Sequence, residues 1–315
     1  MTGATGFVGA AVVDRCRRDP TAAVRIATRR ERVTGPKDVE VVRVGEVGPE
    51  TDWSAAVHDV DTVVHLAARV HVMRDRAADP LAQFRRVNVD GTANLARQAA
   101  AAGARRLVFI SSIKVNGDST PADRPYAADD APAPGDPYGI SKHEAEQQLI
   151  RIAAETGLDI AVIRPVLVYG PGVKANFRFL MRALKSGIPL PLGAIHNARS
   201  LVSRENLADL VFSCLSHPAA PGQVFLVSDG EDLSTPELLR RLGAALGHPA
   251  RLIPVPEFVL RATARVLGTG AIAQRLCGSL QVDIQKTRAL LGWTPPVSVD
   301  TALKRTAWHF LHGGA

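Results

Sequence analysis

The chain has 315 residues, of which 46% are hydrophobic and 22% are charged. This length suffices for one large α/β unit or for a nucleotide-binding domain with a smaller second lobe, and the composition excludes disordered and fibrous proteins. The formal net charge of +7 comes from arginines spread along the chain, without the like-charge block of a nucleic-acid-binding tail, so we expect no nucleic-acid partner.

The three cysteines, Cys16, Cys214 and Cys277, are odd in number and far apart in the sequence. This pattern fits neither a disulfide framework nor a metal site, so we expect a reducing, cytoplasmic location and no bound metal. No apolar run has the uninterrupted length of a membrane span, and the N-terminus lacks the layout of a secretion signal. The nearest candidate, residues 258–276, is interrupted by arginines and is predicted to be one amphipathic helix without stable membrane insertion.

Short β-rich runs alternate with helical stretches in the first half of the chain, which predicts parallel strands joined by crossover helices. The runs are almost continuously apolar, as expected for a sheet that is covered on both faces. The predicted fold class is therefore α/β, with a Rossmann-type, doubly wound parallel sheet. The predicted strands are residues 24–27, 60–65, 106–110 and 160–163, and the predicted helices are residues 88–102 and 138–156.

A glycine-rich loop, Gly3-Ala-Thr-Gly6-Phe-Val-Gly9, stands near the start of the chain and runs into an apolar helix. Glycines let the backbone turn tightly and approach a pyrophosphate, which then lies against the amides at the positive end of the helix. Three glycines can also form a turn and nothing more. The position of the loop in a Rossmann-type pattern favours phosphate binding, so we expect cofactor contacts at Gly3, Gly6, Phe7, Val8 and Gly9.

The strand that normally precedes such a loop is missing, because only Met1 and Thr2 stand before Gly3. This strand is usually central in the sheet, and its loss exposes hydrogen-bonding edges on both neighbours. Either the chain begins several residues downstream of the native start, or the fold tolerates the loss of an inner strand. We expect the first of these.

The strand at residues 24–27 ends where the adenosine ribose of a dinucleotide would lie. An acidic residue there accepts a hydrogen bond from the 2′-hydroxyl of NAD, whereas an arginine accommodates the 2′-phosphate of NADP. Arg29 and Arg30 follow this strand, with no acidic residue between the strand and them. Arg29 therefore favours NADP or dual use, solvent-exposed arginines being the alternative, and the predicted cofactor is NAD or NADP.

Tyr138 and Lys142 lie four residues apart in a predicted helix, so their side chains project from one face. A free tyrosine has a pKa near ~10, and an adjacent cation favours its phenolate. The pair fits a proton shuttle for an alcohol or a ketone, with Tyr138 as the catalytic acid/base and Lys142 as the residue that tunes it. A chance surface pair is the alternative. Ser112, at the end of a predicted strand, adds a hydroxyl that we expect beside the substrate oxygen.

In this order, the glycine loop, Ser112, Tyr138 and Lys142 resemble the extended short-chain dehydrogenase/reductase family, of the NAD-dependent epimerase/dehydratase type, over essentially the whole chain. In that family the strand end His65-Leu-Ala-Ala68 and the run Ser111-Ser-Ile-Lys-Val-Asn-Gly117 line the cofactor and the active site. The expected cofactor contacts outside the glycine loop are Arg29, Glu46, Val47, Leu66, Ala67, Ala68, Asn88, Tyr138, Lys142 and Pro165.

After Tyr169 the chain changes to shorter elements separated by glycine and proline, which predicts a smaller C-terminal α/β substrate lobe. We expect a dinucleotide-binding domain at residues 1–170 and a nucleotide-sugar-binding lobe at residues 171–315, from which residues about 200–228 return to the first domain. The spacing Ser234-Thr-Pro-Glu237 is that of a capping box and predicts the start of a helix in this lobe.

The second half is most similar to the nucleotide-sugar branch of the family, on the run Arg164-Pro-Val-Leu-Val-Tyr-Gly-Pro-Gly172. This resemblance implies a UDP-sugar substrate and a homodimer. The planar guanidinium of Arg199 suits the diphosphate of such a substrate, and an arginine of a surface loop is the alternative interpretation of this residue. The substrate contacts that the resemblance implies are Arg69, Ser112, Asn176, Phe177 and Arg199.

Within this branch the chain is similar to bacterial surface-polysaccharide proteins of two kinds, 4-ketoreductases and 4-epimerases, on residues 113–117 and 282–293. A ketoreductase delivers a hydride to C4 of a UDP-keto-sugar and exchanges its cofactor, whereas an epimerase of UDP-glucose or UDP-N-acetylglucosamine returns the hydride to the other face and keeps NAD bound. Arg29 favours the ketoreductase, and Asn116 stands where UDP-galactose epimerases commonly have tyrosine. We therefore expect a ketoreductase, with the epimerase as the alternative. A non-catalytic, cofactor-sensing protein with the same fold is a third alternative. Such proteins typically lack the tyrosine or the lysine, and this chain has both, which argues against it.

Overall fold

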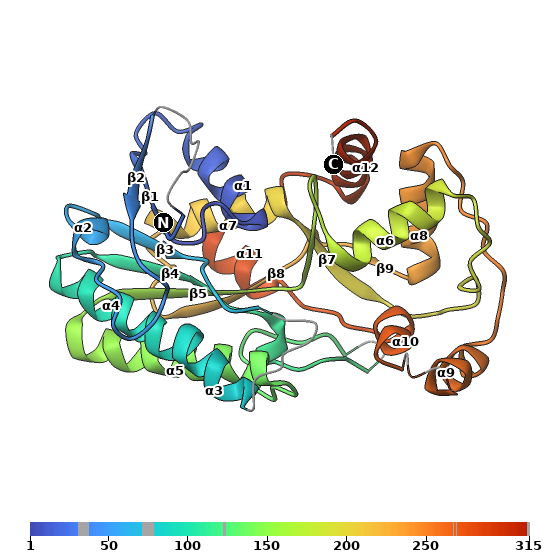
Figure 1. Ribbon diagram of the computed structural model, residues 1–315, viewed down its shortest axis with the longest axis horizontal. Coiled ribbons are helices and arrows are strands. Elements are labelled where there is room, and N and C mark those ends of the chain that lie inside the picture. The colour runs from blue at the N-terminus through green and yellow to red at the C-terminus, as the bar shows by residue number, and fades with distance from the viewer. Residues whose placement is uncertain (31–37, 71–78, 122–123, 267, 269, 314–315) are drawn as a thin grey trace.

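The computed structural model contains a two-stranded and a four-stranded parallel sheet, which lie next to each other in the N-terminal part of the molecule (Figure 1). The strand orders are β1-β2 and β3-β4-β5-β8. The described residues are 1–30, 38–70, 79–121, 124–266, 268 and 270–313. The strands are β1 (Val24–Thr28), β2 (Val39–Arg43), β3 (Thr62–His65), β4 (Arg106–Ile110), β5 (Asp159–Pro165) and β8 (Gln223–Val227).

Met1 and Thr2 lie between β1 and β3, at the place of the inner strand that the sequence lacks. The backbone of Thr2 forms parallel bridges to Ala27 and to His65. The Ala27 nitrogen donates to the Met1 oxygen at 2.8 Å, and the Thr2 nitrogen donates to the Val64 oxygen at 2.9 Å. These two residues therefore join the two sheets into one parallel layer with the order β2-β1-Thr2-β3-β4-β5-β8.

Helices cover both faces of this layer, which confirms the predicted Rossmann-type, doubly wound α/β class (Figure 1). One face carries α1, α7 and α11, and their apolar side chains share a buried core with the strands. The other face carries α4 and α5 over a second core. These and the smaller helices of this part are α1 (Phe7–Cys16), α2 (Ser54–Val57), α3 (Pro80–Arg85), the π-helical turn η1 (Arg86–Asp90), α4 (Gly91–Ala101), the 3₁₀ turn η2 (Ile113–Val115), α5 (Pro137–Thr156), α7 (Arg204–Ser216) and α11 (Gln285–Leu291).

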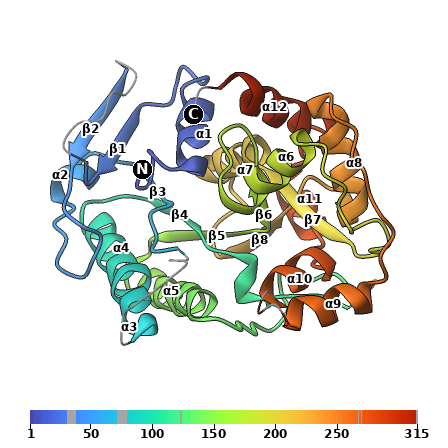
Figure 2. The same ribbon diagram turned by 45° about the vertical axis from the view of Figure 1, so that its right-hand side comes forward.

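A smaller α/β lobe adjoins the main layer, and Figure 2 brings it forward. Its sheet has the order β6-β7-β9, with β6 and β7 parallel and β7 and β9 antiparallel. Helices α6, α8 and α12 pack around a third buried core with these strands. The elements of the lobe are β6 (Leu167–Tyr169), β7 (Arg199–Ser203), β9 (Asp232–Leu233), α6 (Ala175–Lys185), α8 (Thr235–Leu246), α9 (Glu257–Val266), α10 (Gly270–Cys277) and α12 (Val299–His312).

The chain passes between the two parts more than once. β6 belongs to the sheet of the lobe, although it precedes residue 170, and β7 pairs with it. Helix α7 then packs along α1, where Arg15 pairs with Asp209 at 2.7 Å, and β8 pairs with β5 in the main layer. Residues 204–227 therefore lie with the main parallel layer, while residues 199–203 lie in the lobe.

Two local predictions in the lobe have opposite outcomes. The helix start at Ser234 is confirmed, because its hydroxyl caps α8 by accepting a backbone N–H at 3.2 Å. The prediction of one helix over residues 258–276 is wrong, because α9 and α10 replace it. Gly268, between the two, has a φ of 68°, and this left-handed conformation ends a helix.

In the part of the chain that the structure describes, no helix is long and apolar enough to cross a membrane.

Candidate active site

Gly3 and Gly9 make the turn before α1 too tight for any side chain. A Cβ atom on Gly3 would lie 2.7 Å from the Ala67 nitrogen, and one on Gly9 would lie 2.1 Å from the Gly3 oxygen. Gly3 also has a φ of 68°, which side chains disfavour, and the Gly6 nitrogen donates to the Gly3 oxygen at 2.9 Å. The loop thus packs its own backbone against the end of β3 and brings the start of α1 to the same edge.

The first turn of α1 begins at Phe7 without a side-chain cap. Its N-cap residue is Gly6, which makes no capping hydrogen bond, and the turn contains no acidic residue. Backbone N–H groups at a helix start bind anions, because they lack intrahelical partners and stand at the positive end of the helix dipole. The amides of Phe7, Val8 and Gly9 therefore fit the pyrophosphate of a dinucleotide.

Arg204, at the start of α7, is a cation beside this loop that the sequence did not indicate. Its guanidinium carbon lies 5.8 Å from the centre of the Phe7 ring, and a Cβ atom on Gly170 would lie 2.8 Å from its Cγ. Burial lowers its pKa, and its Nε is buried without a hydrogen-bond partner among the described residues. No motif marks Arg204, because its approach to Phe7 depends on how α1 and α7 pack.

Arg29 and Glu46, two of the predicted cofactor contacts, pair with each other. Arg29 Nη1 donates to the two carboxylate oxygens of Glu46 at 2.8 and 3.1 Å. Their side chains are 68% and 79% exposed, and an ion pair as exposed as this contributes little to stability. Either residue is therefore able to exchange its partner for a ligand at little cost. Val47, next in the chain, is half-buried.

Asn88, in η1, fixes the segment that follows β3. Its Oδ1 accepts from the Arg69 nitrogen at 2.8 Å, and its Nδ2 donates to the Arg69 oxygen and to the Ser141 hydroxyl, both at 3.0 Å. The side chain is buried, so these bonds order the segment that contains the half-buried Leu66, Ala67 and Ala68 rather than exposing the amide to a ligand. The predicted cofactor residue is thus a support for its neighbours.

Tyr138 lies in the first turn of α5, beside Ser112. Asp136 caps this helix by accepting a backbone N–H at 2.7 Å. Burial and, to a smaller extent, the charge of Asp136 raise the pKa of Tyr138 to about 12, although the hydrogen bond with Ser112 lowers it. The ring meets Phe84 edge-on at 6.1 Å. The phenol is therefore neutral, and the structure brings the predicted hydroxyl and phenol together.

Lys142 lies one turn further along α5 and is 2% exposed. Its Nζ lies 3.9 Å from the centre of the Phe109 ring, and it makes no hydrogen bond with any described residue. Burial lowers the pKa of Lys142 to about 7, while the carboxylate of Glu146 raises it. Burial, together with the nearby lysine, lowers the pKa of His65 to about 3, so the imidazole is neutral. Lys142 thus keeps its donors available for a ligand hydroxyl next to the phenol.

Ser111 and Ser112 face opposite ways, as successive residues at a strand end do. Ser111 is buried and donates to Glu146 Oε1 at 2.5 Å. The Ser112 hydroxyl accepts from the Lys114 nitrogen at 3.2 Å, on the side of Tyr138. Ser112 is therefore the serine that lies beside Tyr138, whereas the carboxylate behind its neighbour was not predicted from the sequence.

The substrate residues expected in the lobe differ in what they expose. Asn176, in the first turn of α6, is exposed, whereas Phe177 is 4% exposed and stacks on Tyr169 at 5.5 Å. Arg199 is half-buried, and its Nη1 donates at 2.9 and 3.0 Å to carbonyl oxygens at and just after the end of α10. Asn176 and Arg199 therefore offer polar groups, while the Phe177 side chain belongs to the core of the lobe.

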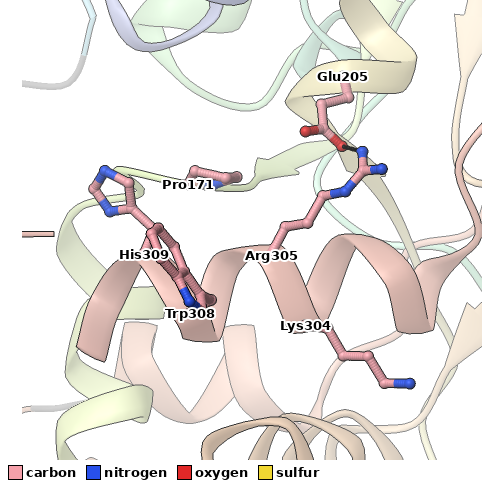
Figure 3. A pocket seen from close by; sticks show the side chains of 6 residues that line it. All are labelled: Pro171, Glu205, Lys304, Arg305, Trp308 and His309. Carbon is pink, nitrogen blue, oxygen red and sulfur yellow. Dashed lines mark hydrogen bonds and ion pairs between the residues drawn. The ribbon is translucent and has the colours of Figure 1, made fainter. Parts of the chain in front are cut away.

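A separate cleft of about 440 Å³ lies along α12 (Figure 3). Its lining shares no residue with the predicted site. Trp308 on this helix is 63% exposed, and Arg305 reaches across to pair with Glu205 at 2.7 Å. The cleft is lined by Pro171, Glu205, Lys304, Arg305, Trp308 and His309.

Residues 1–228 match the model of the NAD dependent epimerase/dehydratase family. A UDP-glucose 4-epimerase of Vibrio cholerae is 46% identical over 312 residues, which cover 99% of this chain and 94% of that protein. Among solved structures, MoeE5 in complex with UDP-glucose and NAD has a TM-score of 0.76 at 24% identity, and UDP-N-acetylglucosamine 4-epimerase from Bacillus cereus has a TM-score of 0.79 at 23% identity. Both likenesses cover 99% of this chain and 98% of the other.

These findings confirm the resemblance that the glycine loop, Ser112, Tyr138 and Lys142 indicated, and with it an enzyme of the extended short-chain dehydrogenase/reductase type. They also confirm the predicted nicotinamide cofactor at the level of the family, which is NAD dependent by its description. The chain belongs to the NAD dependent epimerase/dehydratase family.

Proposed function

We propose that the protein is a 4-epimerase of a UDP-hexose, with UDP-glucose and UDP-galactose as its first candidate pair. One observation carries this proposal: the 46% identity to the Vibrio cholerae UDP-glucose 4-epimerase, which extends over 99% of the chain. It favours the epimerase over the ketoreductase that the sequence alone suggested. The assembled Ser112, Tyr138 and Lys142 supply the proton chemistry that the reaction needs.

In this proposal Tyr138 holds and moves the proton on O4 of the hexose. Ser112 hydrogen-bonds the same oxygen, and its bond to Tyr138 keeps the phenol aligned with it. The ammonium group of Lys142 is buried one helix turn from Tyr138. It favours the phenolate form of Tyr138, which accepts the proton from O4, because an adjacent cation stabilises the charged form. A general acid/base so placed contributes about 10²–10⁴-fold to a rate.

NAD, when bound, would supply the acceptor and the donor for the C4 hydride. The amides of Phe7, Val8 and Gly9 would hold its pyrophosphate, and Lys142 would hold its ribose hydroxyls. Arg69, Asn176 and Arg199 are proposed as contacts of the UDP-sugar; their roles rest on the family resemblance and on the polar groups they present.

The ketoreductase is the second candidate, because Arg29 follows β1 where NADP would place its 2′-phosphate. Glu46 pairs with this arginine, which weakens the argument without removing it, since the pair is exposed and easily broken. The other argument against an epimerase was Asn116. That side chain is 1% exposed and bonds with Arg164 and with a backbone oxygen, so it acts in the interior of the protein.

A product assay separates the two candidates. The purified protein is incubated with UDP-glucose without added reductant, and in parallel with a UDP-4-keto-hexose and NADPH. The epimerase proposal expects UDP-galactose in the first reaction and no stoichiometric NADPH oxidation in the second. NADPH consumption with a silent first reaction would establish the ketoreductase instead.

Homodimerisation and a cytoplasmic location remain predictions. The three cysteines, all buried and unpaired, fit a reducing compartment.

A further inference from the structure

A buried ion pair between Glu146 and Arg164 lies behind the catalytic face of α5. Arg164 donates from Nη2 to Glu146 Oε2 at 2.6 Å and from Nε to Oε1 at 3.0 Å. The side chains are 4% and 5% exposed. A buried pair contributes little net stability, because the cost of removing two charges from water offsets their attraction. Its presence beside an active site therefore calls for a role other than stability.

The pair joins the three segments that carry the site. Glu146 Oε1 accepts from Ser111, whose neighbour Ser112 bonds with Tyr138. Arg164 precedes Pro165 at the end of β5, and its Nη1 donates to Asn116 Oδ1 at 2.9 Å, just beyond η2. One carboxylate thus ties α5 to the ends of β4 and β5, and each of these ends presents a residue to the proposed ligands.

Glu146 also stands one turn beyond Lys142, which itself stands one turn beyond Tyr138. Residues at i, i+4 and i+8 share one face of a helix. Of the ionisable groups around the lysine, His65 on β3 and Tyr138 are neutral, and Glu146, but not its partner Arg164 on β5, shifts the pKa of Lys142. The carboxylate of Glu146 therefore acts on Lys142 as the nearby negative charge.

We propose that Glu146 is a positioning residue of this site, which acts on Tyr138 through Lys142 and on Ser112 through Ser111. The proposal rests on the role given to Tyr138 and Lys142 in the proposed function. Without the negative charge of Glu146, a buried lysine loses its proton at a lower pH, because burial disfavours the ammonium form and nothing offsets it. A neutral Lys142 no longer favours the phenolate of Tyr138.

The variant Glu146→Gln tests the electrostatic part, because the amide oxygen still accepts from Ser111 while the charge is gone. We expect the pKa of Lys142 to fall below its wild-type value of about 7. The acid dissociation constant should rise about tenfold, which is the lower end of the effect of a nearby charge. Nitrogen NMR of the full chain, labelled with ¹⁵N-lysine and assigned with Lys142→Met, measures it directly. Glu144→Gln is the matched control, since Glu144 lies on the same helix and pairs with Arg85 at the surface. An unchanged Lys142 in Glu146→Gln would overturn the proposal.

The double variant Glu146→Gln/Arg164→Met removes both charges and covers the case in which the single variant does not fold, because Arg164 would be left buried and unpaired. A lowered pKa of Lys142 in the folded double variant supports the proposal, and a wild-type pKa there shows that the pair is structural only and overturns it. The titration needs no substrate, so it stands even if the UDP-hexose epimerase proposal fails. Where the epimerase is active, the alkaline limb of its kcat profile should move to lower pH in step with the titration.

Discussion

The main parallel layer and the C-terminal lobe differ in how they hold the residues proposed for the site. In the first part, Asn88, Lys142, Glu146 and Arg164 are buried, and three of them are fixed by hydrogen bonds within the chain. In the lobe, Asn176 is exposed, and Arg199 is half-buried and donates to two carbonyl oxygens. The surroundings of the proposed proton-transfer groups are therefore buried, whereas the residues proposed to contact the sugar keep part of their surface exposed.

Tyr138→Phe should give the largest effect, because it removes the proton donor and leaves the ring packed against Phe84. We expect kcat for the UDP-hexose reaction to fall by about 10²–10⁴-fold, while the amount of NAD that copurifies stays unchanged. Product formation by NMR and cofactor content by absorbance measure the two quantities. Loss of cofactor together with activity would show that Tyr138 acts in binding.

Gly9→Ala should break the cofactor loop without touching the catalytic helix. The added methyl would lie 2.1 Å from the Gly3 oxygen, so the turn must open, and we expect NAD affinity to fall by roughly 100-fold or more. Isothermal calorimetry with NAD checks this. Gly45→Ala is the control, because a Cβ atom there meets nothing within 4 Å. Equal affinity in both variants would contradict the loop assignment.

Arg199→Ala examines the lobe on its own. Removing a cation that contacts a diphosphate costs about 1.5–3 kcal/mol, so KM for the UDP-sugar should rise by roughly 10- to 100-fold. NAD affinity should not change, because Arg199 lies in β7 of the lobe sheet. If NAD affinity falls and KM does not, the arginine supports the fold through its bonds at the end of α10 and does not bind substrate.

His65 should make the first part sensitive to acid. Its pKa of about 3 in the folded chain lies below the unfolded value of about 6.5, so the unfolded state binds the extra proton between these pH values. The contribution of His65 to stability is therefore complete above pH ~6.5 and is lost as the pH falls, by up to about 1.4 kcal/mol per pH unit. Urea unfolding of His65→Gln should show a shallower loss between pH ~6 and ~4. His196→Gln, an exposed residue of the lobe, should follow the wild type.

Arg29→Ala should give the smallest effect, since its partner Glu46 is also exposed. We expect NADP affinity to fall by less than about tenfold and NAD affinity to stay the same, because a surface cation contributes about 1 kcal/mol or less. Binding titrations with both dinucleotides measure the ratio. A fall in NAD affinity of the same size would mean that Arg29 does not distinguish the 2′-phosphate.

The sequence predicted the parallel layer well and the lobe less well, for physical reasons. Buried parallel strands such as β4 and β5 are continuous apolar runs, which are easy to recognise. Helices α9 and α10 were merged because their amphipathic pattern continues across Gly268, whose left-handed conformation depends on context. β2 gave no comparable signal, because most of its residues are at least partly exposed.

Within the site, short spacings were informative and long-range contacts were not. Tyr138 and Lys142 follow from one helix turn, and Ser112 follows from its strand end. Glu146 was within reach of the same reasoning, since it continues the spacing at i+8, but its partner Arg164 lies on another strand. Arg204 meets Phe7 only through helix packing, so no spacing could have indicated it.

Ser112, Tyr138 and Lys142 are proposed to handle the O4 proton while a C4 hydride leaves the UDP-hexose and returns to it within one bound state. The most direct measurement incubates the protein with UDP-glucose that carries deuterium at C4, without added cofactor, and analyses the product by NMR. The account predicts UDP-galactose that retains the deuterium at C4, and no free reduced cofactor in solution. Absence of UDP-galactose, or product that has lost the deuterium, would contradict it.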